Sequence, residues 1–340
     1  MNALYARLVL ATAVFGVTAS ASAQVPADSA SQQAAPSIAS ASAAIPVPTA
    51  TPAVQMLRGF QQSDVKFDVD HLMSLLRDRN HEGWVLSAYP DPKTGQPLIG
   101  AGVSMDLPAR DHPQRDPLNS NPFIEPASAD LWQAAGLDAQ RLNQILDDFH
   151  QKLTVWDMHE YRSHIGELPP QISDQEAMQL LRTAIVQSIL NAKAYCRSFD
   201  QLTASQQMAV SQLVFQMGIN LEEFTQFLEL INSDAIPAPT AKKVTASELA
   251  YWNGVQKSLI QSQWARRYRA RAITVIAMLD PRYSQNPRMA ERRVGATLRP
   301  AVVHRRRGHS SGSTQLASNH KGSAPHVGKG SRHAHSKQKA

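Results

Sequence analysis

The sequence predicts an α+β domain that is predominantly α-helical and carries one small β-hairpin sheet. Four stretches place apolar residues at helical spacing, and one short stretch, at about 87–103, combines strand-like and turn residues. The chain shows no alternation of strands with helices, no glycine-rich phosphate loop and no internal repeat. These observations exclude a parallel α/β sheet and place the strands in one local hairpin.

The first two predicted helices lie on either side of the hairpin in the sequence. One covers about 69–81, where four apolar residues share a helical face. The other begins at Ser173, because Ser173 and Glu176 have the spacing of a capping box and precede a long apolar run.

Two later helices are predicted to form the core. One starts at Thr203, with Gln206 three residues on, and its apolar residues on most sides predict a buried central helix that ends at Gly218. The other covers about 262–279 and stops before Pro281. Further helices are predicted in two places, 138–164 and 222–232.

The N-terminal residues 1–23 have the pattern of a secretory signal peptide. Arg7 precedes an apolar stretch too short to span a bilayer, and Ala21-Ser22-Ala23 offers a small-residue cleavage site. A buried helix or a membrane anchor is the alternative. The pattern predicts a secreted or periplasmic protein without stable membrane insertion.

Two segments of biased composition flank the predicted domain of residues 55–290. Residues 24–54 are rich in Ala, Ser and Pro, which predicts a disordered linker. Residues 291–340 hold eleven Lys and Arg, six His and one acidic residue, so this predicted disordered tail carries the basic charge of the chain. It is expected either to bind anionic polymers or only to aid solubility.

Cys196 is the only cysteine, so the chain forms no internal disulfide and depends on core burial for its stability. No histidine partner for thiol chemistry is evident. We therefore expect Cys196 to be a small buried apolar residue after a helix.

Two acidic residues are candidates for catalysis. Glu82 follows the first predicted helix, beside Trp84, and Asp91 lies in the hairpin. Glycoside hydrolysis uses such a pair, one as the acid that protonates the leaving oxygen and one that orients or activates water. By spacing alone, a solvated helix end and a turn aspartate explain the pair better than a catalytic site does.

The surrounding residues resemble a known family. The pattern Glu82-Gly-x5-Tyr-x-Asp-x3-Gly-x3-Ile-Gly-x-Gly resembles the catalytic hairpin of phage-type lysozymes, glycoside hydrolase family 24. Three later segments are similar to the family in the same order, over about 65–282: Ile172-Ser-Asp-Gln-Glu-Ala177, Val214-Phe-Gln-Met-Gly218, and Ser262-x-Trp264 with Arg271-Ala272.

The resemblance implies a two-lobed fold with a substrate cleft between the lobes. It assigns Glu82 as the general acid and Asp91 as the carboxylate that positions the attacking water, with Gly102 bordering the bound sugar. It also implies that Phe215 and Gln216 lie at the floor of the cleft. Arg271 and Trp264 would be supporting residues. For Arg271 the alternative is an ordinary arginine on a helix surface.

The chain departs from the family pattern at several positions. Leu98 replaces a threonine that is expected to assist the water, and Thr94 is one candidate to substitute for it. Phe227 corresponds to a serine of the cleft. Two insertions, at about 104–170 and 233–258, interrupt the pattern; the first is a candidate lid or sugar-binding wall, and the second is expected to cross the surface.

His112, in the first insertion, has acidic neighbours but no convincing metal-ligand spacing, so we expect a salt-bridged surface loop. No metal and no organic cofactor is predicted.

Together these features predict an exported, monomeric peptidoglycan hydrolase that cleaves the β-1,4 bond between N-acetylmuramic acid and N-acetylglucosamine. Its partners would be peptidoglycan glycan strands. Two alternatives stay open: a lytic transglycosylase that uses Glu82 alone, and a non-catalytic wall-binding protein with the same fold.

Overall fold

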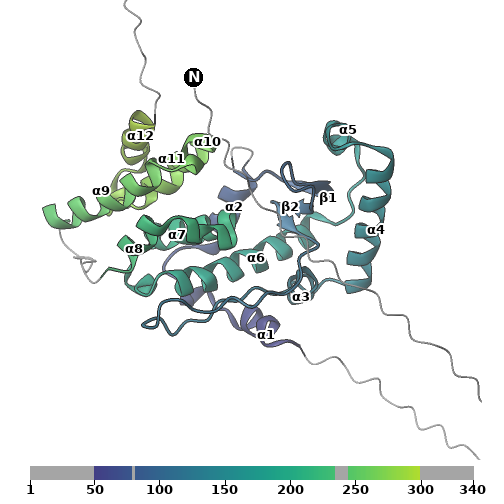
Figure 1. The fold of residues 1–340 in the computed structure, drawn as a ribbon, viewed down its shortest axis with the longest axis horizontal. Coiled ribbons are helices and arrows are strands. Elements are labelled where there is room, and N and C mark those ends of the chain that lie inside the picture. The colour runs from purple at the N-terminus through teal and green to yellow at the C-terminus, as the bar shows by residue number, and fades with distance from the viewer. Residues whose placement is uncertain (1–49, 79–80, 234–243, 299–340) are drawn as a thin grey trace, which may run out of the picture. The chain divides into compact units, whose positions relative to one another are not determined.

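The computed structural model describes residues 50–78, 81–233 and 244–298. The predicted signal peptide, most of the predicted linker and the tail beyond Leu298 lie outside these residues. The predicted fold class is confirmed, because the described chain is mostly helical with one small antiparallel sheet (Figure 1).

The sheet has three strands, where the sequence predicted a hairpin of two. Strands β1 (Val85–Pro90), β2 (Pro97–Gly100) and β3 (Val103–Ser104) pair antiparallel in that order. Tyr89 pairs with Leu98, and the register shifts between Val85 and Tyr89, where the strand is irregular. The extra strand forms because Gly102, at φ +82°, reverses the chain directly after β2.

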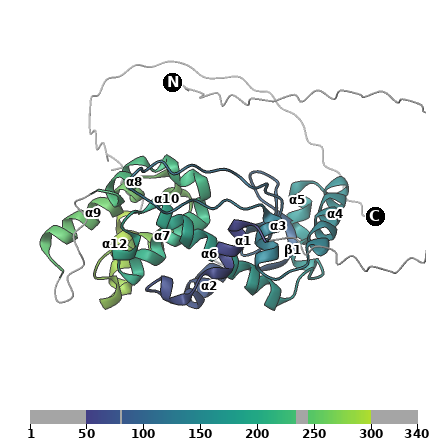
Figure 2. The same ribbon diagram turned by 90° about the horizontal axis from the view of Figure 1, so that it is seen from below.

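Helix α6 (Asp174–Tyr195) runs beneath the sheet and the later helices (Figures 1 and 2). Its predicted capping box is confirmed, since Ser173 accepts from the Glu176 N–H and Glu176 accepts from the Ser173 N–H. Residues near its start, including Ala177, pack in the core of the sheet, and residues further on, including Ile189, pack in the larger helical core. This one helix therefore connects two apolar cores.

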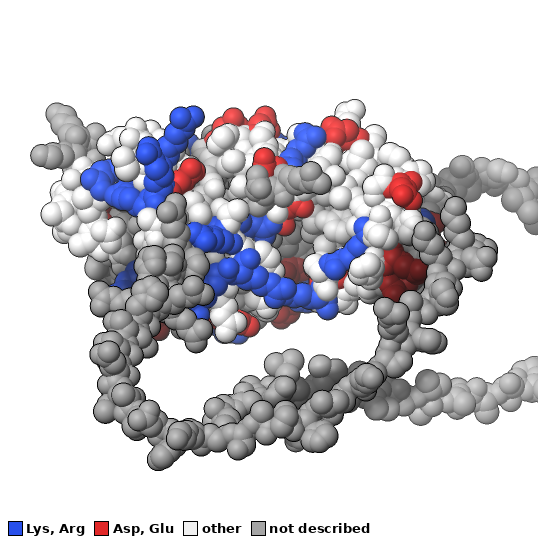
Figure 3. Space-filling view, turned by 90° about the horizontal axis from the view of Figure 1, so that it is seen from above, with Lys and Arg blue, Asp and Glu red and all other residues white. Residues whose placement is uncertain are grey.

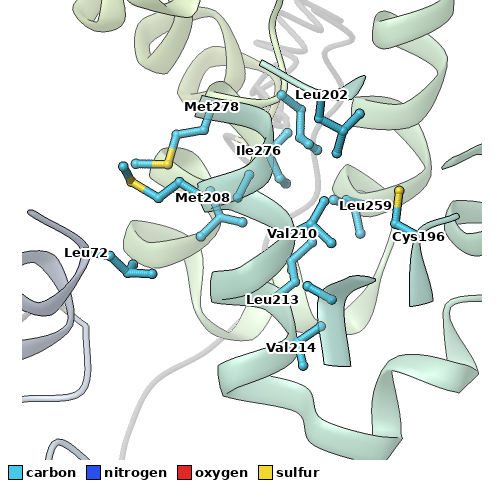
Figure 4. Close-up of a cluster of buried hydrophobic side chains, with 14 of the residues drawn as sticks. Leu72, Cys196, Leu202, Met208, Val210, Leu213, Val214, Leu259, Ile276 and Met278 are labelled. Carbon is cyan, nitrogen blue, oxygen red and sulfur yellow. The ribbon is translucent and has the colours of Figure 1, made fainter. Parts of the chain in front are cut away.

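The larger core surrounds α7 (Ala204–Met217), whose predicted capping box at Thr203 and end at Gly218 are both confirmed. Leu213 of α7 belongs to this cluster together with Leu72 of α2 (Val69–Arg77) and Ile276 of α11 (Arg269–Met278) (Figure 4). Cys196 is fully buried in this core, and burial raises the pKa of its thiol to about 12. The expectation of a small buried cysteine directly after a helix is thus confirmed.

The first insertion builds much of the smaller core. It contributes α3 (Ser128–Ala134), α4 (Ala139–Val155) and α5 (Met158–His164), which pack on the sheet through Trp132, Phe149 and Tyr161. The helical prediction over 138–164 is confirmed, but the segment forms two helices, because Trp156 is extended and Asp157 starts a new helix with its own capping box.

Residues 105–127 of the insertion form a long connection that contains no helix. Asn119 and Gln114 in this connection donate side-chain hydrogen bonds to the carbonyl oxygen of Ala194, at the end of α6. Since the last carbonyls of a helix lack intrahelical partners, these bonds satisfy acceptors that would otherwise be buried and unpaired.

Three predicted helices end early, or are divided, at residues that the spacing of apolar residues does not mark. Helix α2 (Val69–Arg77) is shorter than predicted because Asp78 is extended. The predicted helix 262–279 is divided at Tyr268 into α10 (Gln263–Arg267) and α11 (Arg269–Met278). The predicted helix 222–232 is a 3-10 turn followed by α8 (Thr225–Ile231).

The predicted boundaries of the domain were also too narrow. Helix α1 (Pro52–Gly59) starts inside the predicted linker and buries Val54, and α12 (Pro287–Thr297) extends into the predicted tail and buries Val294. Helix α9 (Ala246–Ile260) lies in the second insertion, which was expected to cross the surface, yet Trp252 is in the core. The 3-10 turns are Gln62–Asp64, Ile165–Glu167, Phe199–Gln201, Gly218–Glu223 and Tyr283–Gln285.

Within the described residues, no helix has the length and apolar character needed to cross a membrane.

Candidate active site

A groove of about 990 Å³ lies between the sheet and the helices α7, α10 and α11. All seven residues that the resemblance singled out line it: Glu82, Asp91, Gly102, Phe215, Gln216, Trp264 and Arg271. The two candidate carboxylates therefore share one groove, as the catalytic interpretation requires.

Glu82 lies in the turn that follows α2. Its backbone N–H donates to the carbonyl oxygen of Leu76, 3.1 Å away, so the turn folds back onto the end of the helix. Gly83 has φ +80°, a conformation that favours glycine, and it redirects the chain into β1. This local fold aims the Glu82 side chain into the groove.

Arg271 of α11 holds this turn from the other side of the groove. Its guanidinium lies 3.0 Å from Glu82 Oε2 and also donates to the carbonyl oxygen of His81. Both side chains of the ion pair are largely buried, with 13% and 19% of their surface exposed. Arg271 is therefore part of the site, and the alternative of an ordinary helix-surface arginine is wrong.

The surroundings of Glu82 favour its protonated form. Burial raises the pKa of Glu82, and the Arg271 charge and hydrogen bond lower it by less, so the net shift is upward. A carboxyl group with a raised pKa can donate a proton at mildly acidic pH.

Asp91 has the opposite character. Partial burial raises the pKa of Asp91, but the N–H groups of Thr94 and Lys93, the Thr94 hydroxyl and the Lys93 charge together lower it further, so the net shift is downward. All three hydrogen bonds go to Oδ1, at 2.8, 2.8 and 3.1 Å. Oδ2 accepts no hydrogen bond from the described residues and can accept one from a water in the groove.

Tyr89 is a site residue to which the sequence analysis gave no role. Burial raises its pKa strongly, and the charges of both Glu82 and Asp91 raise it further. The phenol lines the groove and stays protonated near both carboxylates, so its hydroxyl can donate a hydrogen bond to an acceptor oxygen there and can also accept one. The sequence feature that could have identified Tyr89 is its position between the two acidic residues of the hairpin pattern.

Gly102 lies close to Glu82 and Tyr89. With φ at +82°, a Cβ built on Gly102 would lie 3.8 Å from Glu82 Oε2 and from the Tyr89 hydroxyl oxygen. The glycine therefore both permits the turn between β2 and β3 and keeps the groove open beside the candidate acid.

The helical wall of the groove presents polar atoms without protein partners. The side-chain amide of Gln216 and the indole N–H of Trp264 are buried, and neither makes a hydrogen bond with the described part of the chain. Buried donors and acceptors of this kind are costly when unpaired, and those that line a groove are suited to bind a polar ligand. Phe215 adds an apolar surface that contacts both cores.

The positions that depart from the family pattern also lie in the groove. Leu98 and Phe227 both line it, so an aliphatic and an aromatic side chain stand where hydroxyl groups were expected. Thr94 donates its hydroxyl to Asp91 Oδ1, so it orients the carboxylate.

His112 belongs to a salt-bridged surface loop, as expected, because its neighbours Asp111 and Pro113 are exposed, but its own side chain is buried. Its side chain is 3% exposed, Nε2 lies 2.8 Å from Glu222 Oε1, and the ring stacks on Phe123 at 3.8 Å. Arg115 pairs with the other Glu222 oxygen. No group of His, Cys, Asp and Glu that could hold a metal ion occurs among the described residues.

No family model, curated protein or solved structure matches this chain.

Proposed function

We propose that this chain is a glycoside hydrolase that cleaves the β-1,4 bond between N-acetylmuramic acid and N-acetylglucosamine in peptidoglycan. Glu82 donates a proton to the leaving glycosidic oxygen. Asp91 accepts a hydrogen bond from the attacking water through Oδ2 and assists its attack on the sugar carbon, with inversion of configuration.

The proposal rests on one observation, which is that two carboxyl groups in a single groove have pKa values shifted in opposite directions. At a pH between the two values, Glu82 is protonated and Asp91 is ionised, which is the state that acid-assisted hydrolysis needs. Tyr89, Gln216 and Trp264 supply hydrogen-bonding groups for sugar hydroxyl and acetamido substituents.

The wall substrate is supported by the resemblance of the hairpin to phage-type lysozymes and by the predicted signal peptide. Peptidoglycan lies outside the cytoplasmic membrane, so its hydrolase must be exported. We therefore propose a secreted or periplasmic location.

A second reaction is favoured by Leu98. An aliphatic side chain in the groove gives no hydrogen bond to an attacking water, and a lytic transglycosylase needs no such water. In that reaction Glu82 acts alone, first as acid and then as base, and the 6-hydroxyl of muramic acid attacks to give 1,6-anhydro ends. Asp91 would then be dispensable.

The test is the rate of peptidoglycan digestion by the wild-type protein and by Glu82→Gln and Asp91→Asn. Hydrolysis predicts that Glu82→Gln lowers the rate by about a hundredfold or more, because general acid catalysis is lost. Asp91→Asn should lower it strongly as well, and the products should carry reducing ends. Transglycosylation predicts anhydro ends and little effect of Asp91→Asn.

Glu223→Gln is a matched control, since Glu223 is an acidic residue that lines the same groove and has no part in the proposed chemistry. Its rate should stay within about threefold of wild type, as is usual for surface substitutions. Wild-type protein that binds glycan but leaves it intact, with no change on Glu82→Gln, would favour a non-catalytic wall-binding protein.

A further inference from the structure

The first insertion supplies one wall of the groove. Arg162 and Ile165 both line it, and both come from the segment of α5 and the turn after it. These residues lie outside the segments that resemble the lysozyme family, so this wall is a property of this chain.

Helix α5 is fixed firmly against the hairpin. Tyr161 is 1% exposed, and its hydroxyl donates to the carbonyl oxygen of Ala88 in β1 at 3.0 Å. Met158 lies against the hairpin turn, since its Sδ is 3.7 Å from the position of a Cβ built on Gly95. Such anchoring on a packed sheet gives the adjacent side chains a defined place.

Two cations, Arg162 and Lys93, line this side of the groove. Arg162 is four residues after Met158, so the two side chains lie on the same face of α5. Met158 contacts the turn that carries Lys93, and Lys93 itself lines the groove. The two positive charges, Arg162 of the insertion and Lys93 of the hairpin turn, therefore line the same groove, from two elements that contact each other through Met158.

Neither cation forms an ion pair within the described residues, in contrast to Arg271, which is paired with Glu82, although the Lys93 charge acts on the nearby Asp91 carboxylate and lowers its pKa. Arg267, on the opposite wall, is likewise without an acidic partner there and lies over the Tyr268 ring. The acidic residues that line the groove are Glu82, Asp91 and Glu223. In the space-filling view from above, Lys and Arg side chains gather across the middle of the face (Figure 3).

We infer that Arg162 and Lys93 form a subsite for a carboxylate carried by a substituent of the glycan. A guanidinium presents two parallel N–H groups that match a carboxylate, and the lysine adds a second positive charge. The subsite would make the enzyme prefer glycans with charged substituents over neutral ones of the same backbone. This inference rests on the proposed function, because it assigns a substrate class to the same groove.

The experiment compares wild-type protein with Arg162→Gln on peptidoglycan strands before and after chemical amidation of their carboxyl groups. We expect Arg162→Gln to lower kcat/KM on the untreated strands about tenfold, the effect of losing one charge-assisted hydrogen bond, through KM more than kcat. On amidated strands the two proteins should be equal. Arg266→Gln is the matched control, because Arg266 is an exposed arginine of α10 that does not line the groove.

A third substrate separates the two sources of carboxylate. Strands whose stem peptides have been removed keep only the lactyl carboxylate of muramic acid. If the effect of Arg162→Gln persists on them, the lactyl group is bound; if it disappears, the carboxylate belongs to the peptide.

An equal loss of kcat/KM on untreated and amidated strands, or no loss on either, would overturn the subsite. Calorimetric binding of the same strands by Glu82→Gln, with and without Arg162→Gln, makes the comparison independent of turnover. If the wild-type protein cleaves no strand, the proposed hydrolysis fails while the binding comparison still decides the subsite. If none of the strands binds to the protein, both the proposed hydrolysis and the proposed subsite are refuted.

Discussion

At the scale of single residues, the site depends on how differently the protein surrounds two chemically similar carboxyl groups. Glu82 is mostly buried beside an arginine, whereas Asp91 is held by three donors on one oxygen. The first environment disfavours charge and the second stabilises it. The same distinction would set the pH dependence of the proposed reaction.

The opposite shifts predict a bell-shaped profile of kcat/KM against pH. The rate should fall as pH rises through the pKa of Glu82, which lies above the ordinary glutamate value, because the acid loses its proton. It should fall as pH drops through the pKa of Asp91, below the ordinary aspartate value, because the carboxylate gains one. An optimum in the alkaline range would contradict these roles.

Gly102→Ala tests the need for glycine beside the acid. The nearest atoms to an added Cβ are 3.8 Å away, so space is available, and the cost arises from the positive φ. We expect the free energy of unfolding to fall by about 1–2 kcal/mol, measured by chemical denaturation. Gly59→Ala is the control, because Gly59 has no neighbouring atom within 4 Å and no positive φ; equal effects at both positions would refute the argument.

At the scale of elements, the site forms where a sheet hairpin, the end of α2 and the start of α11 meet. Arg271 joins two of these elements across 190 positions of sequence by binding the His81 carbonyl and the Glu82 carboxylate. Its charge also lowers the pKa of Glu82.

Arg271→Gln should therefore move the alkaline limb of the pH profile to higher pH, because the opposing charge next to Glu82 is lost. The acidic limb, set by Asp91, should stay in place. The measurement is kcat/KM over pH for the variant and the wild type. An alkaline limb that moves to lower pH would show that Arg271 does not act on Glu82 in this way.

Helix α5 offers a test of the insertion as a structural part of the domain. Tyr161→Phe removes the buried hydrogen bond to Ala88 and leaves that carbonyl unpaired, so the free energy of unfolding should fall by about 1–3 kcal/mol. Tyr268→Phe, at a tyrosine that is 36% exposed, is the control and should change stability little. Stability unchanged by Tyr161→Phe would mean that α5 does not hold to the sheet through this bond.

The sequence predicted elements whose signals are local, and it missed those that depend on distant contacts. The capping boxes at Ser173 and Thr203 mark true helix starts because side chain and backbone lie within one turn. The break at Tyr268 and the burial of α9 depend on packing against other helices, which periodicity does not encode. One missed signal was local, the capping pair of Asp157 and Glu160 that starts α5.

The site was predicted in the same way. Glu82, Asp91 and Gly102 are close in the sequence, and the resemblance placed the helical residues of the groove with them. The contribution of Arg162 was not predicted, because it depends on how the insertion folds back over the hairpin.

At the scale of the whole molecule, the charge is unevenly distributed along the chain. Residues 299–340 hold nine Lys and Arg and no Asp or Glu. We propose that this segment increases adhesion to anionic wall polymers, through electrostatic attraction that salt screens.

Removal of residues 299–340 should weaken binding to anionic polymer in co-sedimentation at low salt and have a smaller effect at high salt. Cleavage of short soluble glycans should be unaffected, because the groove lies entirely within residues 82–271. Equal adhesion with and without the tail would show that it serves another purpose.

The most direct test of the central claim, that Glu82 and Asp91 together hydrolyse a glycan, is digestion of peptidoglycan in ¹⁸O-labelled water. Inverting hydrolysis by this pair predicts one labelled oxygen at each new reducing end and α-configured products at first, with neither formed by Glu82→Gln. Unlabelled 1,6-anhydro ends, or intact glycan after incubation with the wild-type protein, would contradict it.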